Sequence, residues 1–287
     1  MTGCTDITFT SPQFDVIARS NQTTRHVDIY AWLYGPLSEI ASRMSLYFEE
    51  LDYRQTPIGA LSLRRRRELR LGVDVFEIKL GDEFLMSSLF TESEIALARL
   101  GLAQLPGQGL DVVIGGLGLG YTAKAVLEHQ RVASLIVVDA LEAVIDWHRK
   151  GLVPLGRELT DDTRCSFVHG DFFALAASGA GFDPAAPGRH FDAVLVDIDH
   201  SPDFLLDPQN AAFYSNEGLA RLAAHLHPDG VFGLWSNERP DDAFTARLGR
   251  VFADARAEAV TFYNPLQDKP FTQTVYLAKK QPAPRNT

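Results

Sequence analysis

The chain has 287 residues, 46% of them hydrophobic, which is enough apolar material for a large folded domain and excludes a disordered protein. Its 27 lysines and arginines against 37 aspartates and glutamates give a formal charge of −10. This balance argues against nucleic acid as a partner, because proteins that bind polyanions usually carry a basic face.

The cysteines and the apolar runs indicate the cellular compartment in which we expect the protein. Cys4 and Cys165 lie far apart in the sequence, so we expect neither a disulfide framework nor a metal site. The first residues lack the basic start and apolar core of a secretory signal, and no apolar run approaches the ~20 residues that cross a bilayer. We therefore expect a cytoplasmic protein with no membrane partner.

The N-terminal region, which we assign to residues 1–109, combines a helix with β-hairpins. Apolar residues recur every three to four positions over 27–49 and predict an amphipathic helix. Its apolar stripe would pack within the chain or against a second copy in a homodimer. Short alternating segments at 58–63 and 73–80 predict antiparallel strands. Between them, the four consecutive arginines at 64–67 are typical of a solvated turn, with a phosphate- or acid-binding site as the alternative.

A helix start and a glycine-rich turn come next. Thr91 and Glu94 have the spacing of a capping box. The second region, residues 110–287, opens with a continuous apolar run that ends in glycines, and helical periodicity begins at Tyr121. This pattern predicts a buried parallel strand, a tight turn that holds a nucleotide, and a helix. The candidate cofactor-binding glycines are Gly115, Gly116, Gly118 and Gly120.

After this turn, strand and helix patterns alternate along the chain. We expect strands at about 134–140, 165–171, 191–199 and 230–237, and helices at about 121–129, 142–150, 211–226 and 241–255. The last two strands, at 257–263 and 272–278, are joined by too few residues for a parallel crossover and should be antiparallel. The fold class predicted is α/β, with a Rossmann-like, doubly wound, mostly parallel sheet and a small N-terminal helix and β-hairpin unit.

Two classes of nucleotide fit the glycine turn. A dinucleotide would use the G-x-G-x-x-A pattern at 118–123, with Asp139 holding a ribose. S-adenosylmethionine (AdoMet) would use the G-x-G-x-G turn at 116–120, with Asp139 accepting hydrogen bonds from the ribose, Asp171 accepting from the adenine amino group, and Phe172 near the base. A plain dinucleotide fold gives no reason for an acid after the third strand, so we favour AdoMet or its decarboxylated form.

The order of several motifs carries a family resemblance. An N-terminal β unit is followed by Asp82-Glu83-Phe84, the glycine turn, Asp171 and the segment Val196-Asp197-Ile198-Asp199-His200-Ser201-Pro202. From about residue 52 to residue 280, the chain resembles the spermidine synthase (polyamine aminopropyltransferase) family, which has the class I AdoMet-dependent methyltransferase fold. The resemblance implies that Asp197 takes a proton from the attacking amine. We expect Asp199 and His200 beside it to contribute to that base.

Three departures from the family pattern bear on the reaction. The family's glycine turn carries an aspartate that holds the amino group of the decarboxylated cofactor, whereas this chain has Gly118. Met86-Ser87-Ser88 replaces a Tyr-His-Glu trio, and His200 replaces an aspartate that binds the amine. We therefore expect an AdoMet-dependent transferase that methylates a small-molecule nucleophile. The alternatives are an aminopropyltransferase that uses decarboxylated AdoMet and a non-catalytic nucleoside-binding protein.

Overall fold

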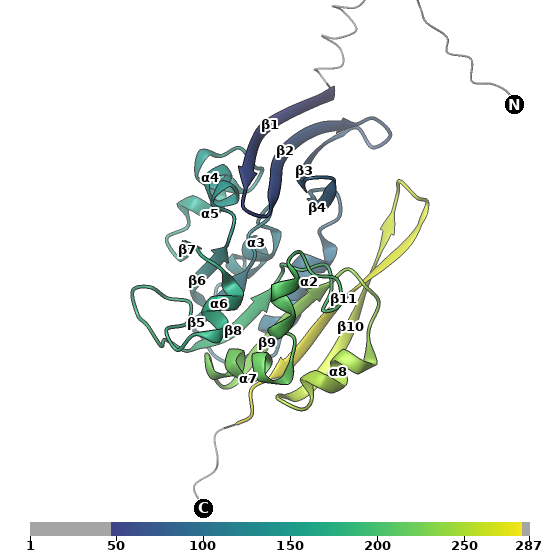
Figure 1. Ribbon diagram of the computed structural model, residues 1–287. Helices are drawn as coiled ribbons and strands as arrows, with labels where there is room; N and C mark the ends of the chain where they lie inside the picture. The colour runs from purple at the N-terminus through teal and green to yellow at the C-terminus, as the bar shows by residue number, and fades with distance from the viewer. Residues whose placement is uncertain (1–46, 283–287) are drawn as a thin grey trace, which may run out of the picture. The chain divides into compact units, whose positions relative to one another are not determined.

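The computed structural model describes residues 47–282 of the chain (Figure 1). Most of the helix predicted at 27–49 therefore lies outside the described residues. The prediction is wrong for its last two positions, because Phe48 and Glu49 begin a strand and pair with Arg66 and Arg65 of the next one. Among residues 47–282, no helix is long and apolar enough to cross a membrane.

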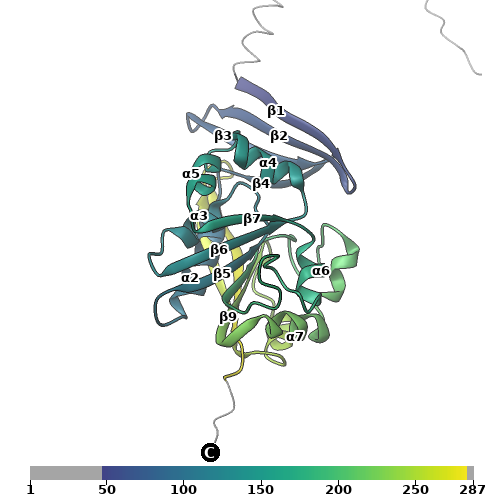
Figure 2. The ribbon, with the colours of Figure 1, turned by 90° about the vertical axis from the view of Figure 1, so that its left-hand side faces the viewer.

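Four antiparallel strands form a first sheet in the order β1-β2-β3-β4. They are β1 (Phe48–Thr56), β2 (Gly59–Glu68), β3 (Val73–Leu80) and β4 (Glu83–Ser87). The predicted hairpin unit is confirmed, and β1 and β4 extend it. Figures 1 and 2 show β1 beside helix α4 (Glu142–Lys150), where the indole N–H of Trp147 donates to Asp52 at 2.6 Å. The first sheet therefore packs on the helices of the second region.

The arginine run lies within β2, so the turn predicted there is wrong. Successive side chains of a strand point to opposite faces, and each arginine finds a carboxylate on its own side. Arg66, for example, binds Glu77 at 2.6 Å and Glu68 at 2.7 Å. The other ion pairs of the run are Arg64 with Glu50, Arg65 with Glu49, and Arg67 with Asp74. The run is thus part of a cross-strand charge ladder whose acids come from the chain itself.

The second sheet has seven strands in the order β10-β11-β9-β8-β5-β6-β7. Its parallel strands are β5 (Leu110–Gly115), β6 (Val132–Asp139), β7 (Cys165–His169), β8 (Phe191–Val196) and β9 (Leu226–Ser236). The antiparallel strands are β10 (Ala253–Asn264) and β11 (Lys269–Lys279). The predicted mostly parallel sheet with an antiparallel end is confirmed.

Helices cover both faces of this sheet. On one face lie α2 (Glu92–Ala103), α3 (Tyr121–Leu127), α4 and α5 (Gly156–Asp161), and on the other lie α6 (Phe172–Ala177), α7 (Asn216–Ala224) and α8 (Asp242–Leu248). Within β5, Val112 and Ile114 pack in the core of the first face and Val113 in the core of the second. Burial on both faces explains why β5 is a continuous apolar run.

Two predicted helices are shorter than expected. The helix at 211–226 is divided into a 3₁₀ turn, η1 (Pro208–Ala212), and α7, because Ser215 begins a new helix by accepting a hydrogen bond from the N–H of Gly218 at 3.1 Å. The helix at 241–255 ends at Leu248, and the chain enters β10 at Ala253. The first difference divides a predicted helix and the second shortens one, and neither changes the order of the strands.

Candidate active site

A cavity of about 660 Å³ lies at the carboxyl ends of the parallel strands. Its other walls come from β4, the first turn of α2 and the β10–β11 hairpin. Its lining includes one histidine, His200, and no lysine or arginine among the described residues. The carboxyl groups that line it are those of Glu94, Asp139, Asp171, Asp197 and Asp207. An acidic cavity of this kind favours a positively charged ligand.

Two of the four candidate glycines face this cavity. Gly116 and Gly118 line it and have left-handed φ angles of +91° and +47°. A Cβ on Gly116 would clash with the carbonyl oxygen of Asp197, and one on Gly118 would clash with the sulfur of Met86. The turn therefore needs glycine at both positions, for conformation and for space.

The other two candidate glycines serve packing. A Cβ on Gly115 would lie 2.6 Å from the ring of Phe172, and one on Gly120 would lie 2.5 Å from Leu159 and 2.9 Å from His148. Neither glycine lines the cavity. The prediction that Gly115 and Gly120 contact the cofactor is therefore not supported, since their missing side chains make room for the core.

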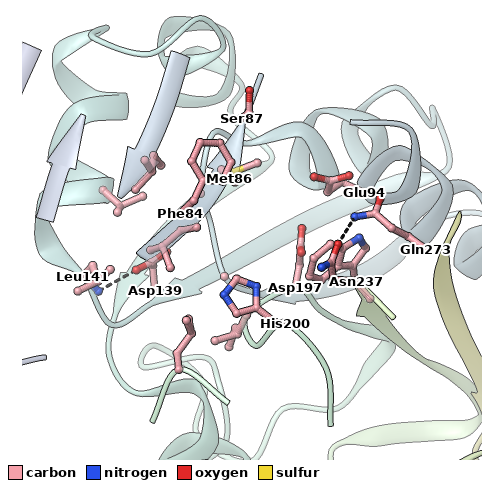
Figure 3. A pocket seen from close by; sticks show the side chains of 18 of the residues that line it. Phe84, Met86, Ser87, Glu94, Asp139, Leu141, Asp197, His200, Asn237 and Gln273 are labelled. Atoms are coloured by element: carbon pink, nitrogen blue, oxygen red, sulfur yellow. Dashed lines mark hydrogen bonds between the residues drawn. The ribbon is translucent and has the colours of Figure 1, made fainter. Parts of the chain in front are cut away.

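Asp139 ends β6 and lines the cavity with its carboxyl group held in place. Its oxygens accept a hydrogen bond from the backbone N–H of Leu117 at 2.8 Å and one from that of Leu141 at 2.7 Å. Figure 3 shows the bond with Leu141. Burial raises the pKa of Asp139, an effect that these hydrogen bonds partly offset. The carboxyl group thus ties the glycine turn to the end of β6, and its contact with a ribose stays a prediction.

Asp171 and Phe172 occupy different environments although they are neighbours. One oxygen of Asp171 accepts hydrogen bonds from the N–H groups of Phe173 and Ala174 at the start of α6, while the side chain is exposed at the cavity. Phe172 is only 2% exposed and stacks on Phe182, with ring centroids 5.0 Å apart. Asp171 is thus accessible to a ligand, whereas Phe172 mainly supports the floor of the cavity from the core.

Asp197 follows β8 and faces the cavity. Its backbone N–H donates to the carbonyl of Gly115 at 2.8 Å, and its carboxylate accepts a hydrogen bond from the Thr122 hydroxyl at 2.7 Å. Burial raises the pKa of Asp197 to about 6, against the opposing effect of Thr122. A carboxylate in this environment is a stronger base than one in water, as the predicted role requires.

Asp199 lies outside the cavity, and its predicted role as a base is not supported. It is 1% exposed, and burial raises its pKa. Its oxygens accept hydrogen bonds from the Leu206 N–H at 2.8 Å, the Tyr214 hydroxyl at 2.8 Å and the Asn210 amide at 3.2 Å. With these partners, Asp199 fixes the loop that follows β8.

His200 lines the cavity next to this loop. Its Nε2 atom pairs with a carboxylate oxygen of Glu83 at 2.9 Å, and its ring stacks on Phe204 with centroids 5.0 Å apart. The structure therefore brings Asp197 and His200 to the cavity and leaves Asp199 in the core.

Glu94 is a cavity residue, although its spacing from Thr91 predicts a helix cap. The capping box is wrong, because the Thr91 side chain makes no capping hydrogen bond and Glu94 points inward, only 6% exposed. Burial and the charge of Asp197 raise the pKa of Glu94 to about 8. The spacing of the helix could have placed Glu94 on the buried face, because residues three and four apart lie on the same side of a helix. Glu94 precedes the buried Leu97 and Ala98 by three and four residues.

The fold and the cavity together define a class of protein. A mostly parallel seven-stranded sheet, with a glycine turn after its first strand and a carboxyl group after its second, is a Rossmann-like fold of the class I methyltransferase type. A family model described as the spermine/spermidine synthase domain matches residues 93–240, which is just over half of the chain. The chain therefore belongs to the spermine/spermidine synthase family, as the order of its motifs predicts.

The curated relatives include two kinds of transferase. Polyamine aminopropyltransferase 2 of Pseudomonas aeruginosa is 27% identical over 157 residues, which are 53% of this chain and 42% of the relative. Putrescine N-methyltransferase 4 of Nicotiana tabacum is 30% identical over 137 residues, which are 47% of this chain and 31% of the relative. The chain thus spans less than half the length of these relatives.

Among solved structures, the spermidine synthase of Thermotoga maritima has a similar fold. The TM-score is 0.62 at 20% sequence identity, over 82% of this chain and 74% of that chain. At this identity, the similarity concerns the fold alone.

Proposed function

We propose that this protein transfers a methyl group from AdoMet to an amine nitrogen of a small molecule. The acidic cavity supports this proposal, because five carboxyl groups line it and no lysine or arginine does so within residues 47–282. A sulfonium and an ammonium group both carry positive charge, and nearby carboxylates offset the hydration that each loses on binding.

The residues present fit an adenosyl sulfonium ligand. Gly116 and Gly118 let the backbone of the turn approach the ligand, and Asp139 and Asp171 place carboxyl oxygens at the ends of two strands. When bound, AdoMet supplies an activated carbon and a good leaving group. The protein then has to align the acceptor, exclude water and remove a proton from the acceptor amine. Asp197 is the residue that accepts this proton, since it faces the cavity and has a pKa of about 6.

Met86 is the reason to prefer methyl transfer. Its sulfur lies where a side chain on Gly118 would project, and it accepts a hydrogen bond from the N–H of Leu119 at 2.9 Å. A thioether therefore takes the place where, by the family resemblance, a carboxylate holds the amino group of the decarboxylated cofactor. Decarboxylated AdoMet, whose ammonium group has no carboxylate of its own, loses a charged partner there, whereas the ammonium group of AdoMet has the cofactor's own carboxylate beside it.

Aminopropyl transfer is the second candidate, and one observation favours it. AdoMet carries a carboxylate that its decarboxylated form lacks, and the cavity lining offers this carboxylate no lysine or arginine. The named relatives include an aminopropyltransferase as well as an N-methyltransferase. The two candidates therefore differ in the cofactor and share the amine acceptor.

Product mass separates the candidates. The full chain is incubated with each cofactor in turn and with a panel of monoamines and diamines, and the mass added to the amine is measured. We expect a methyl group from AdoMet, and much weaker binding of decarboxylated AdoMet by isothermal titration. Aminopropyl products alone would replace the first candidate by the second, and no transfer from either cofactor would contradict both.

The cofactor preference can also be tested at the glycine turn. In the double variant Gly118→Asp with Met86→Ala, the second change removes the side chain with which the first would clash. We expect this variant to bind decarboxylated AdoMet more tightly than the single variant Met86→Ala, which is its matched control. Equal affinities in the two variants would contradict the role given to Gly118.

A further inference from the structure

Glu94 lies in a polar cluster beside Asp197 and has no role in the proposed reaction as described above. The cluster joins the first turn of α2 to the end of β9 and to the middle of β11, and Figure 3 shows Glu94 and Asp197 in the same part of the cavity as Gln273 and Asn237. An oxygen of Glu94, Oε2, is 2.8 Å from the hydroxyl of Ser93. The other oxygen, Oε1, has no side-chain partner among the described residues.

Counting protons in this cluster assigns one to Glu94. The Ser93 hydroxyl accepts a hydrogen bond from the indole N–H of Trp235 at 2.8 Å and lies 2.6 Å from Oε1 of Gln273. The Nε2 group of Gln273 donates to Oδ1 of Asn237 at 2.9 Å, and the Gln273 oxygen faces Ser93. A serine hydroxyl has a single proton, so when it donates to Gln273 the 2.8 Å contact with Glu94 is a hydrogen bond donated by a protonated Glu94.

The charges around Glu94 agree with this count. The ionisable groups that face it are Asp197 beyond β8 and Tyr121 at the start of α3, and Glu92 lies on its own helix. None of these is a cation, and Glu94 forms no ion pair with a lysine, arginine or histidine in the described part of the chain. A buried carboxyl group without a cation, beside a second carboxylate, keeps its proton.

We propose that Glu94 is an uncharged amine-binding residue, whose oxygen Oε1 accepts a hydrogen bond from the acceptor's nitrogen while Asp197 takes the acceptor's proton. This inference rests on the proposed function. One N–H bond of the ammonium group breaks and an O–H bond forms on Asp197. The freed nitrogen lone pair then bonds to the methyl carbon, and the electrons of the carbon–sulfur bond go to sulfur. Glu94 keeps its proton throughout and holds the nitrogen beside Asp197.

A spectroscopic measurement tests the protonation state without any turnover. A protonated carboxyl group has its own carbonyl stretch in the infrared, distinct from that of a carboxylate. We expect this band in the wild-type protein at neutral pH and expect Glu94→Gln to lack it, whereas Glu92→Gln, which changes an exposed glutamate on the same helix, keeps it. Wild-type protein without the band would overturn the inference.

Activity tests the hydrogen bond to the acceptor. A glutamine at position 94 offers the same oxygen and an N–H where the acid has its O–H, whereas Glu94→Leu offers neither. We expect Glu94→Leu to raise KM for the amine at least about tenfold over Glu94→Gln, the size expected for a lost buried hydrogen bond. Equal defects in the two variants would contradict the role of Glu94. Absence of transfer by the wild-type protein would contradict the proposed function, and the infrared band would still decide the state of Glu94.

Discussion

Replacing Glu94 by glutamine should remove a loss of stability that the wild-type protein undergoes as pH rises. Burial and the charge of Asp197 raise the pKa of Glu94 from 4.5 to about 8 in the folded protein. Below pH 4.5 both folded and unfolded chains carry the proton, so the carboxyl group imposes no cost. Above that pH the unfolded chain releases the proton and the folded one keeps it, so the free energy of unfolding falls by about 1.4 kcal/mol for each pH unit. Over the whole interval the loss is on the order of 5 kcal/mol.

Urea unfolding at several pH values measures this effect. Between about pH 5 and pH 8, we expect the stability of Glu94→Gln to rise relative to wild type by on the order of 4 kcal/mol, because glutamine does not titrate. Glu92→Gln is the matched control, since its side chain is exposed, and we expect it to follow wild type within about 0.5 kcal/mol. If the curves for Glu94→Gln and wild type ran parallel across this range, Glu94 would not be a proton-bearing buried acid.

Three further predictions concern residues around the cavity. Asp197→Asn should slow transfer by roughly 10²–10⁴-fold while cofactor affinity, measured by titration, stays near wild type, and an unchanged rate would remove Asp197 as the base. Gly116→Ala should lower the free energy of unfolding, measured by thermal unfolding, by more than about 2 kcal/mol, because the φ of Gly116 is +91° and the new Cβ would clash with Asp197. Gly170→Ala is the control and should cost under about 1 kcal/mol, because its Cβ would lie 3.5 Å from the nearest side chain. Tyr214→Phe should lower the free energy of urea unfolding by about 1–3 kcal/mol, because it removes a hydrogen bond from the buried Asp199, and no loss would contradict the role given to this bond.

The parallel sheet could be predicted because its strands carry a local signal. Strand β5 is buried on both faces and therefore reads as a continuous apolar run, and the short link between β10 and β11 allows only antiparallel pairing. The arginines of β2 give the opposite case. Four successive charges hide the alternation of a strand, and their partners Glu49, Glu50 and Glu77 become neighbours only through the sheet.

The cavity was partly predictable for a related reason. Asp139 and Asp197 follow apolar strands, so the parallel sheet brings them to one edge. Asp199 is only two residues beyond Asp197, and its burial depends on hydrogen bonds with a loop that local sequence does not reveal. Glu94 joins the cavity through a helix that the family motifs do not single out, and its environment depends on Gln273, about 180 residues away.

The close fit between Gly116 and Asp197 divides the cavity into a part that resists change and a part that tolerates it. The N–H of Asp197 binds the carbonyl of Gly115, and its own carbonyl fills the space beside Gly116, so the cofactor turn and the base move together. A substitution on either side would disturb both. The wall from the β10–β11 hairpin lies outside this linkage, whereas β4 contacts the glycine turn through Met86. New acceptors would therefore be acquired through the hairpin wall, while the transfer chemistry is inherited intact.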